Sequence, residues 1–222
     1  MNNKICIIGG TSNISKSFIK MVENNFDIIT VGKSSNNDIE FDINNGNFNN
    51  INKIPLNCSY YLIAAGILYP KKIIEQTNNE ILNSISLNLL FPTYLIEQIL
   101  DINEDVRIVV VGSESGKKGS YDTTYFLSKA ALKSYIQEKH IKSKNQSLNM
   151  IAPSVILDTK MTQDRDDLEE VLERAKDLPK ERYLMSEEVA KLIYYLFFED
   201  SGYINNEVIN MNGGKFARMN YR

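Results

Sequence analysis

The chain has 222 residues, a mass of 25.4 kDa, a formal net charge of -3 and a sequence pI of about 5.4. This length suits one large domain or two small ones and is sufficient to bury a substantial core. The net negative charge argues against binding to nucleic acid, which requires a positively charged surface. No run of 18 apolar residues is present that would cross a membrane.

Apolar runs of strand length alternate with amphipathic stretches along the chain. The first run, "KICIIGG" at 4–10, begins without the charged and apolar regions of a signal peptide, so we expect a cytoplasmic protein. Further strands are expected at 27–32, 39–43, 60–66, 107–113, 148–154 and 206–214, and helices at 15–24, at 79–100, from about 122, and at 186–198. We expect Ser186 to cap the last helix, with Glu187 and Glu188 in its first turn.

Near-continuous apolar strands that alternate with helices indicate a parallel sheet covered on both faces. Right-handed crossovers then give a doubly wound, Rossmann-like α/β fold, whose ligand crevice lies at the carboxyl ends of the strands. The sequence has no internal repeat and no low-complexity linker, so we predict a single domain over 1–222. The charged stretch within 159–185 has the pattern of an exposed helix and is predicted to form a mobile lid over the substrate.

Two cysteines and one histidine limit the available metal chemistry. Cys6 and Cys58 lie in apolar runs, where a free cysteine usually behaves as a small buried hydrophobe. His140 lies in a polar, lysine-rich stretch and is interpreted as a surface residue. We therefore expect no metal, and only a site built from carboxylates stays open.

The stretch "GGTSNIS" at 9–15 ends the first strand and precedes the first helix. In a doubly wound sheet this turn presents free amides and the positive end of the helix dipole to a pyrophosphate. Glycines are usual there because the backbone bends sharply and approaches the phosphates. Gly9 and Gly10 alone are a weak signal for a nucleotide.

The stretch "YDTTYFLSKAALKSY" at 121–135 places Tyr125 and Lys129 one helical turn apart on one face. Such a pair alone is more often a solvated helix surface, because the chain contains 12 tyrosines and many lysines. Other motifs must therefore converge on this pair before it indicates chemistry.

Taken together, the motifs resemble those of the short-chain dehydrogenase/reductase family over nearly the whole chain. The matching positions are Gly9, Asn13 and Ser15 in the glycine-rich turn, Asp42 after the third strand, Ala65 and Gly66 after the fourth, Asn88 in the long helix, Ser113 after the fifth strand, Tyr125, Ser128 and Lys129 in Y-x-x-S-K, and Pro153, Ile156 and Thr159 after the sixth strand. Two of the three turn glycines are replaced, by Asn13 and Ser15. Asn13 tolerates left-handed backbone geometry and Ser15 can cap or bind an oxygen, so the turn remains feasible.

The resemblance implies hydride transfer between a nicotinamide cofactor and a carbonyl or secondary alcohol, with Tyr125 as general acid/base. A phenol has an ordinary pKa of about 10, which an ammonium at Lys129 would lower, and Lys129 would also hold the nicotinamide ribose. Ser113 would donate to the developing oxyanion, and Asn88 would hold a proton-relaying water through its backbone. Simpler interpretations stay open: Asn88 as a residue that bends its helix, Ser113 as a turn residue and Thr159 as a loop or cap residue.

The cofactor-binding positions that the resemblance implies are Gly9, Thr11, Ser12, Asn13, Ile14, Ser15, Lys33, Ser34, Asp42, Ala65, Gly66, Tyr125, Lys129, Pro153, Ile156 and Thr159. An acid at the end of the second strand would bind the ribose 2′-hydroxyl and repel a 2′-phosphate. Gly32 occupies that position and Lys33 follows, so we predict that NADP(H) is preferred over NAD(H). An ordinary solvent-exposed lysine is the competing interpretation.

The charges of the lid favour a polar carbonyl or alcohol substrate, such as a sugar derivative. By resemblance we expect a homodimer or homotetramer formed through the helices that carry Asn88 and Tyr125. A non-catalytic NAD(P)-sensing protein on the same fold is the alternative, motivated by the missing glycines; a scaffold without nucleotide is a third possibility. The complete set of Ser113, Tyr125 and Lys129 argues against a sensor, which needs no proton donor.

Overall fold

The chain is described by a computed structural model that covers residues 3–42, 48, 51–199 and 202–217. Its strands within these residues are β1 (Lys4–Ile8), β2 (Asp27–Gly32), β3 (Ile39–Glu40), β4 (Tyr60–Ile63), β5 (Arg107–Val111), β6 (Ser147–Pro153) and β7 (Val208–Met211). They form one parallel sheet in the order β3-β2-β1-β4-β5-β6-β7, which confirms the predicted doubly wound fold. The predicted strand at 39–43 is shorter than expected, and its last residue lies outside the described ones.

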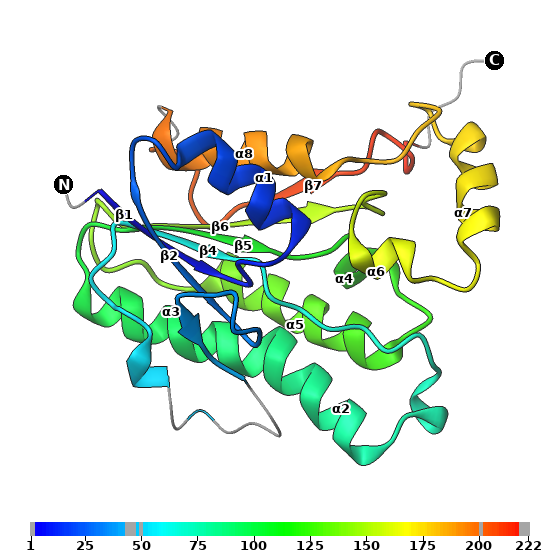
Figure 1. Ribbon diagram of the computed structural model, residues 1–222, viewed down its shortest axis with the longest axis horizontal. Coiled ribbons are helices and arrows are strands. Elements are labelled where there is room, and N and C mark those ends of the chain that lie inside the picture. The colour runs from blue at the N-terminus through cyan, green and yellow to red at the C-terminus, as the bar shows by residue number, and fades with distance from the viewer. Residues whose placement is uncertain (1–2, 43–47, 49–50, 200–201, 218–222) are drawn as a thin grey trace.

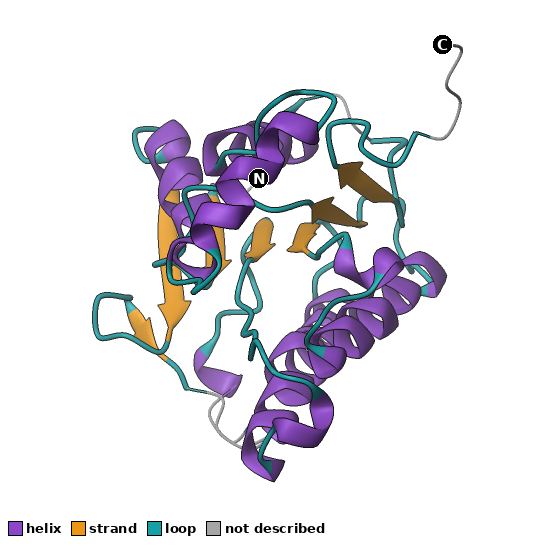
Figure 2. Cartoon of the chain, turned by 90° about the vertical axis from the view of Figure 1, so that its right-hand side faces the viewer, coloured by secondary structure: helices purple, strands orange, loops and turns teal. Residues whose placement is uncertain are grey.

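Helices cover both faces of this sheet. They are α1 (Asn13–Val22), α2 (Asn78–Ile85), α3 (Phe91–Ile102), α4 (Ser115–Lys118), α5 (Thr123–Glu138), α6 (Lys160–Gln163), α7 (Leu168–Arg174) and α8 (Ser186–Phe198), with the short helices η1 (Ile51–Lys53), η2 (Ile73–Glu75), η3 (Ser86–Leu90) and η4 (Ala175–Asp177). Figure 1 shows α1 and α8 above the sheet and α2, α3 and α5 below it, and Figure 2 shows the strands between the two helix layers from the side.

Alternate residues of each central strand enter two separate cores. In β1, Cys6 and Ile8 face the core between the sheet and the helices α3 and α5. Ile5 and Ile7 face the core between the sheet and the helices α1 and α8. Because side chains along a strand alternate between faces, a strand covered on both sides must be apolar throughout. This explains why the strands read as continuous apolar runs, and both Cys6 and Cys58 are buried free thiols, as predicted.

An aromatic cluster fixes α1 and α8 to β4. The ring of Phe198 lies 4.6 Å from that of Phe26 and 4.9 Å from that of Tyr60, and Phe18 of α1 lies 5.6 Å from Phe197. Edge and offset contacts of this kind stabilise by about 0.5–1.5 kcal/mol per pair beyond the area that they bury. The cluster therefore fixes the position of α1, and with it the turn at the start of α1.

The long helix predicted at 79–100 is interrupted. It consists of α2, a π-helical turn η3 and α3, and Asn88 lies within the π turn. Pro92 follows in the first turn of α3 and has no N–H to donate to the carbonyl of Asn88 four residues earlier. Such breaks are frequent at functional sites.

The predicted cap of α8 is wrong by one residue. Met185 is the N-cap, and the Glu188 carboxylate accepts from its amide at 3.0 Å. Ser186 instead lies inside the helix and donates its amide and its hydroxyl, both at 2.9 Å, to the Asp158 carboxylate. This tertiary contact positions the segment after β6, which lines the crevice described below.

Candidate active site

The first turn forms one wall of the crevice at the carboxyl ends of β1 and β4. Gly9 has a φ of +87°, and a methyl group there would lie 2.8 Å from the backbone nitrogen of Ala65. Its own amide donates to the Val31 carbonyl at 2.7 Å. Only glycine combines this backbone conformation with so close an approach to a neighbouring strand.

Ser12 and Ser15 hold the turn, and Ser15 stands where the family motif has glycine. Ser12 is the N-cap of α1 and its hydroxyl accepts from the Ser15 amide at 3.1 Å. The buried Ser15 hydroxyl donates to the Gly9 carbonyl at 2.9 Å. The serine at position 15 therefore closes the turn by a hydrogen bond.

Asn13 adopts helical geometry as the first residue of α1, so the left-handed conformation considered from the sequence is wrong. Its side-chain amide donates instead to the carbonyl of Asp158. Asn13 thus joins the first turn to the segment after β6, across the mouth of the crevice.

The second wall follows β4 and is held by Asn88. The Asn88 side chain accepts from the Ile67 amide at 2.9 Å and donates to the Ile67 carbonyl at 2.8 Å. A methyl group at Gly66 would lie 3.2 Å from the Asn88 amide oxygen and 3.5 Å from the Lys129 ammonium nitrogen. Asn88 is fully buried, so its side chain anchors the loop and does not face the cavity.

The floor of the crevice carries the Y-x-x-S-K residues. Tyr125 and Lys129 are 7% and 4% exposed on the first turns of α5, and the Lys129 nitrogen lies 5.7 Å from the centre of the Tyr125 ring. The same nitrogen donates to the Val111 carbonyl at 3.3 Å. Ser113, directly after β5, forms a hydrogen bond with Tyr125. The phenol, the hydroxyl and the amine therefore converge on one place.

Burial has the largest effect on the pKa values of Tyr125 and Lys129. It raises the pKa of Tyr125 above 10.0, an effect that the hydrogen bond with Ser113 opposes and the Asp122 charge reinforces. The expected lowering of this pKa by Lys129 is not observed. Burial also lowers the pKa of Lys129 to about 8, so that this amine remains largely protonated at neutral pH.

A cavity of about 370 Å³ joins the first turn, the β4 loop and the Y-x-x-S-K residues. Twelve predicted site residues line it: Thr11, Ser12, Asn13, Ile14, Ala65, Gly66, Ser113, Tyr125, Lys129, Pro153, Ile156 and Thr159. The predicted residues that do not line it are Gly9, Ser15, Lys33, Ser34, Asp42 and Asn88. Gly9, Ser15 and Asn88 lie behind its walls, as the contacts above show.

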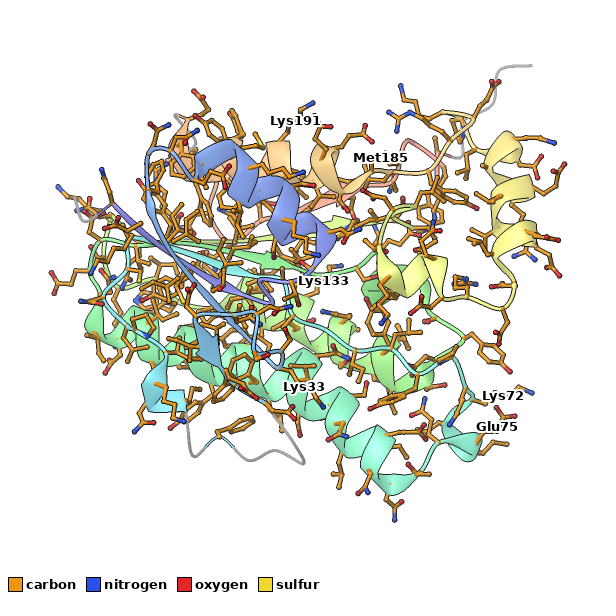
Figure 3. The ribbon with its side chains drawn as sticks, in the orientation of Figure 1. Lys33, Lys72, Glu75, Lys133, Met185 and Lys191 are labelled. Carbon is orange, nitrogen blue, oxygen red and sulfur yellow. The ribbon has the colours of Figure 1, made fainter. Side chains whose placement is uncertain are left out.

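Lys33, labelled in Figure 3, lies past the end of β2 with its side chain 78% exposed. Its ammonium is 3.2 Å from the carboxylate of Asp42, which follows β3. The two predicted ribose- and adenine-contacting residues are therefore adjacent but oppositely charged, and the charge of Lys33 is partly balanced.

The sequence reasoning missed further lining residues: Ala64, Leu68, Val111, Gly112, Glu114, Ser115, Ser120, Ser154, Val155, Lys160, Met161, Thr162 and Arg165. Most flank a predicted residue, so adjacency to the motifs was an available signal. Only part of the predicted lid at 159–185 lines the cavity. The lining residues belong to α6 or lie next to α6, whereas no residue of α7 lines the cavity. Figure 1 shows α7 at the edge of the molecule, beyond α6.

The residues present fit a nicotinamide cofactor. Gly9 leaves no room for a side chain and Gly66 leaves little, and the start of α1 opens onto the same cavity as Lys129. Within the described residues, no group of three or more His, Cys, Asp or Glu side chains could hold a metal ion. Among the same residues, no helix has the length and apolar character needed to cross a membrane.

Comparison with known proteins agrees with this geometry. A family model described as Enoyl-(Acyl carrier protein) reductase matches residues 49–215. Similar curated proteins include 3-oxoacyl-[acyl-carrier-protein] reductase FabG of Chlamydia trachomatis (36% identity, 48% of this chain and 44% of the relative) and of Buchnera aphidicola subsp. Baizongia pistaciae (28%, 68% and 64%). Acetoacetyl-CoA reductase of Acinetobacter sp. is 30% identical over 50% of this chain and 45% of its own. The chain thus spans about half the length of the first of these relatives.

Solved structures share the fold. An oxidoreductase of the short chain dehydrogenase/reductase family from Burkholderia thailandensis has a TM-score of 0.80 at 16% identity, with 98% of this chain and 94% of that chain covered. A 4-hydroxyisoleucine dehydrogenase complexed with NADH has a TM-score of 0.80 at 21% identity, over 98% and 100% of the two chains. A variant of ElxO with NADPH bound has a TM-score of 0.81 at 20% identity, over the same shares.

Proposed function

Because the chain belongs to the short-chain dehydrogenase/reductase family of oxidoreductases, we propose that it reduces a carbonyl group with NADPH and that Tyr125 delivers the proton. The observation that carries this proposal is the convergence of Ser113, Tyr125 and Lys129 on the cavity that also contains the start of α1. A protein that only senses the cofactor needs no buried phenol beside a buried amine.

The three residues divide the work on the substrate oxygen. When bound, the nicotinamide cofactor supplies the hydride. The Tyr125 phenol, whose pKa burial holds above its ordinary value, is in the protonated form that reduction consumes. Ser113 donates a second hydrogen bond to the same oxygen as its negative charge develops. The Lys129 ammonium holds the ribose of the cofactor in the same cavity.

The segments around the cavity would hold the cofactor by their position. The start of α1 offers its free amides to the pyrophosphate, and Ala65 and Gly66 allow the adjacent ribose to approach closely. The segment from Pro153 to Thr159 lines the opposite side of the cavity. Lys33 supports a preference for NADP(H), because β2 ends in Gly32 and not in an acid, and the lysine that follows attracts a 2′-phosphate. The Asp42 carboxylate beside Lys33 opposes this preference.

A 3-oxoacyl thioester is the first substrate class to test. The relatives are named as reductases of 3-oxoacyl groups on acyl carrier protein or of acetoacetyl-CoA. Leu68, Val155 and Met161 add apolar surface to the cavity, which suits a short acyl chain. The polar substrate expected from the charges of the lid, such as a sugar derivative, forms the second arm of the same screen.

Fluorescence titration with NADPH and NADH tests the cofactor proposal. We expect tighter binding of NADPH, a loss of this preference in Lys33→Ala, and a larger preference in Asp42→Asn, since that change removes the negative charge 3.2 Å from Lys33. Equal affinity of wild type for both cofactors would contradict the NADPH preference. Absence of any binding would contradict both the reductase and the sensor.

Turnover separates the reductase from the sensor. We expect acetoacetyl-CoA or a polar ketone to oxidise NADPH in the presence of wild type, and Tyr125→Phe to be inactive while it still binds NADPH. Tight cofactor binding without turnover of either class would favour the sensor.

We also propose that the chain assembles into a homodimer or homotetramer. Three large apolar side chains are about half exposed on the helices that flank the site: Leu90 (46%), Tyr94 (47%) and Leu127 (47%). They lie on η3, α3 and α5, the helices through which the sequence-based expectation places the contact. Light scattering of the purified protein measures the assembly directly.

A further inference from the structure

Asp122 is a buried carboxylate that the proposed chemistry does not use. It is 1% exposed and forms the N-cap of α5, the helix of Tyr125. Among the described residues it forms no ion pair, so its charge is balanced by hydrogen bonds alone. A buried charge is costly unless several donors compensate it.

One oxygen of Asp122 holds the start of α5. Its Oδ1 accepts from the Tyr125 amide at 2.9 Å and from the Gln76 side-chain amide at 2.9 Å. The Thr124 hydroxyl lies 2.8 Å from this oxygen and 2.8 Å from the Gln76 carbonyl oxygen, and its single proton serves one of them. The cap thus fixes the backbone of the residue that carries the phenol.

The other oxygen holds the loop between β4 and α2. Its Oδ2 accepts from the Tyr69 amide at 2.7 Å, a charge-assisted hydrogen bond. Asn88 holds Ile67 on the near side, so the cavity-lining Leu68 lies between two anchored residues. The segment that follows reaches the edge of the molecule at Lys72 and Glu75 (Figure 3).

From these contacts we propose that Asp122 is a positioning residue that holds Tyr125 and the cavity wall at Leu68 as one unit. Oδ1 accepts from Tyr125 of α5 and from Gln76 of the segment between β4 and α2, and Oδ2 accepts from Tyr69 of that same segment. A neutral cap of the same helix cannot accept at both oxygens. Asparagine would still accept from Tyr125 but would turn an NH₂ group toward the Tyr69 amide.

The carboxylate has a second consequence, which rests on the proposed function. Its negative charge disfavours the phenolate and raises the pKa of Tyr125. The other charged groups that line the same cavity are Lys129 on α5, Glu114 after β5, and Lys160 and Arg165 on and beside α6. Arg165 is paired with Asp167 at 2.7 Å, and Lys71 in the anchored loop with Glu80 at 2.6 Å. Asp122 therefore extends the pH range over which Tyr125 donates a proton.

Hydrogen exchange on the full chain tests the positioning role without requiring activity. We expect the Tyr69 amide to exchange about tenfold faster or more in both Asp122→Asn and Asp122→Ala, and the first turn of α5 to lose protection only in Asp122→Ala. Thr77→Ala, which removes the ordinary cap of α2, is the control and should leave Tyr69 unchanged. Unchanged exchange at Tyr69 in Asp122→Asn would overturn the proposal.

The pH profile of acetoacetyl-CoA reduction tests the charge. We expect the loss of activity at high pH to begin at a lower pH in Asp122→Asn than in wild type, because the change removes a negative charge that raises the pKa of Tyr125. Asp101→Asn removes an equal charge from an exposed surface pair with Lys142 and should leave the profile in place. An unshifted profile in Asp122→Asn contradicts this role, whereas inactivity of wild type contradicts the proposed function and leaves the exchange result to decide the positioning role.

Discussion

Gly9 offers the sharpest test of how the first turn is built. Its φ of +87° costs an alanine about 1–3 kcal/mol of backbone strain. The added methyl would also lie 2.8 Å from the Ala65 nitrogen and 2.9 Å from the Ala64 carbonyl carbon, atoms of a neighbouring strand end that cannot rotate away. Overpacking of this kind costs about 1–3 kcal/mol more, so Gly9→Ala should lose about 2–6 kcal/mol in total.

Gly119→Ala is the matched control. Gly119 has nearly the same φ, +88°, but nothing lies within 4 Å of an added methyl. It should therefore show the backbone cost alone, about 1–3 kcal/mol. Urea unfolding of both variants, with unchanged dependence on denaturant, gives the difference directly.

The difference in unfolding free energy between Gly9→Ala and Gly119→Ala measures the cost of the close approach at position 9. We expect Gly9→Ala to be less stable than Gly119→Ala by about 1–3 kcal/mol and to bind NADPH more weakly, because Ala65 lines the cavity. Equal losses of stability would refute the interpretation that close approach to the β4 loop, rather than φ alone, requires glycine at position 9.

Three further predictions concern single side chains. Ser15→Ala removes the hydroxyl donor of the Gly9 carbonyl, which keeps the Ser12 amide as a donor, and should cost about 0.5–1.5 kcal/mol in urea unfolding. Because burial lowers the pKa of Lys129 to about 8 from 10.5, the unfolded chain binds more protons between these values, and wild type gains stability as the pH rises through them. The stability of Lys129→Met does not change with pH in this way. We expect the unfolding free energy of this variant to exceed that of wild type by about 3 kcal/mol at pH 7, and the difference to shrink as the pH approaches 10. Tyr94→Asp places a charge on the exposed face of α3 and should reduce the mass measured by light scattering to that of a monomer.

The sheet could be predicted from the sequence because its strands are apolar on both faces. The run at 108–111 shows this directly, since its residues enter the two cores alternately. The break within the predicted helix at 79–100 entered the sequence analysis only as the alternative that Asn88 bends its helix, although Pro92 also signals it locally. The prediction of Ser186 as the cap of α8 is wrong for another reason, because the partner of Ser186, Asp158, is 28 residues away in sequence and becomes a neighbour only in the fold.

The residues of the site also divide into those that the sequence predicts and those that only the fold brings together. Motif spacing predicts which residues surround the cavity, and twelve of them do. It cannot predict that Asp42 lies beside Lys33, that burial raises the pKa of Tyr125 without any lowering by Lys129, or that Asp122 joins α5 to the β4 loop. Each of these depends on distances across elements that are remote in the chain.

The most direct test of the account is the rate of NADPH-dependent acetoacetyl-CoA reduction by Tyr125→Phe, measured beside its NADPH affinity. The phenol donates a proton and, among the described residues, makes no hydrogen bond to the backbone that phenylalanine would lose. We therefore predict a rate about 10²- to 10⁴-fold below wild type with NADPH affinity unchanged. A Tyr125→Phe protein that reduces the substrate at the wild-type rate would contradict the assignment of Tyr125 as the proton donor.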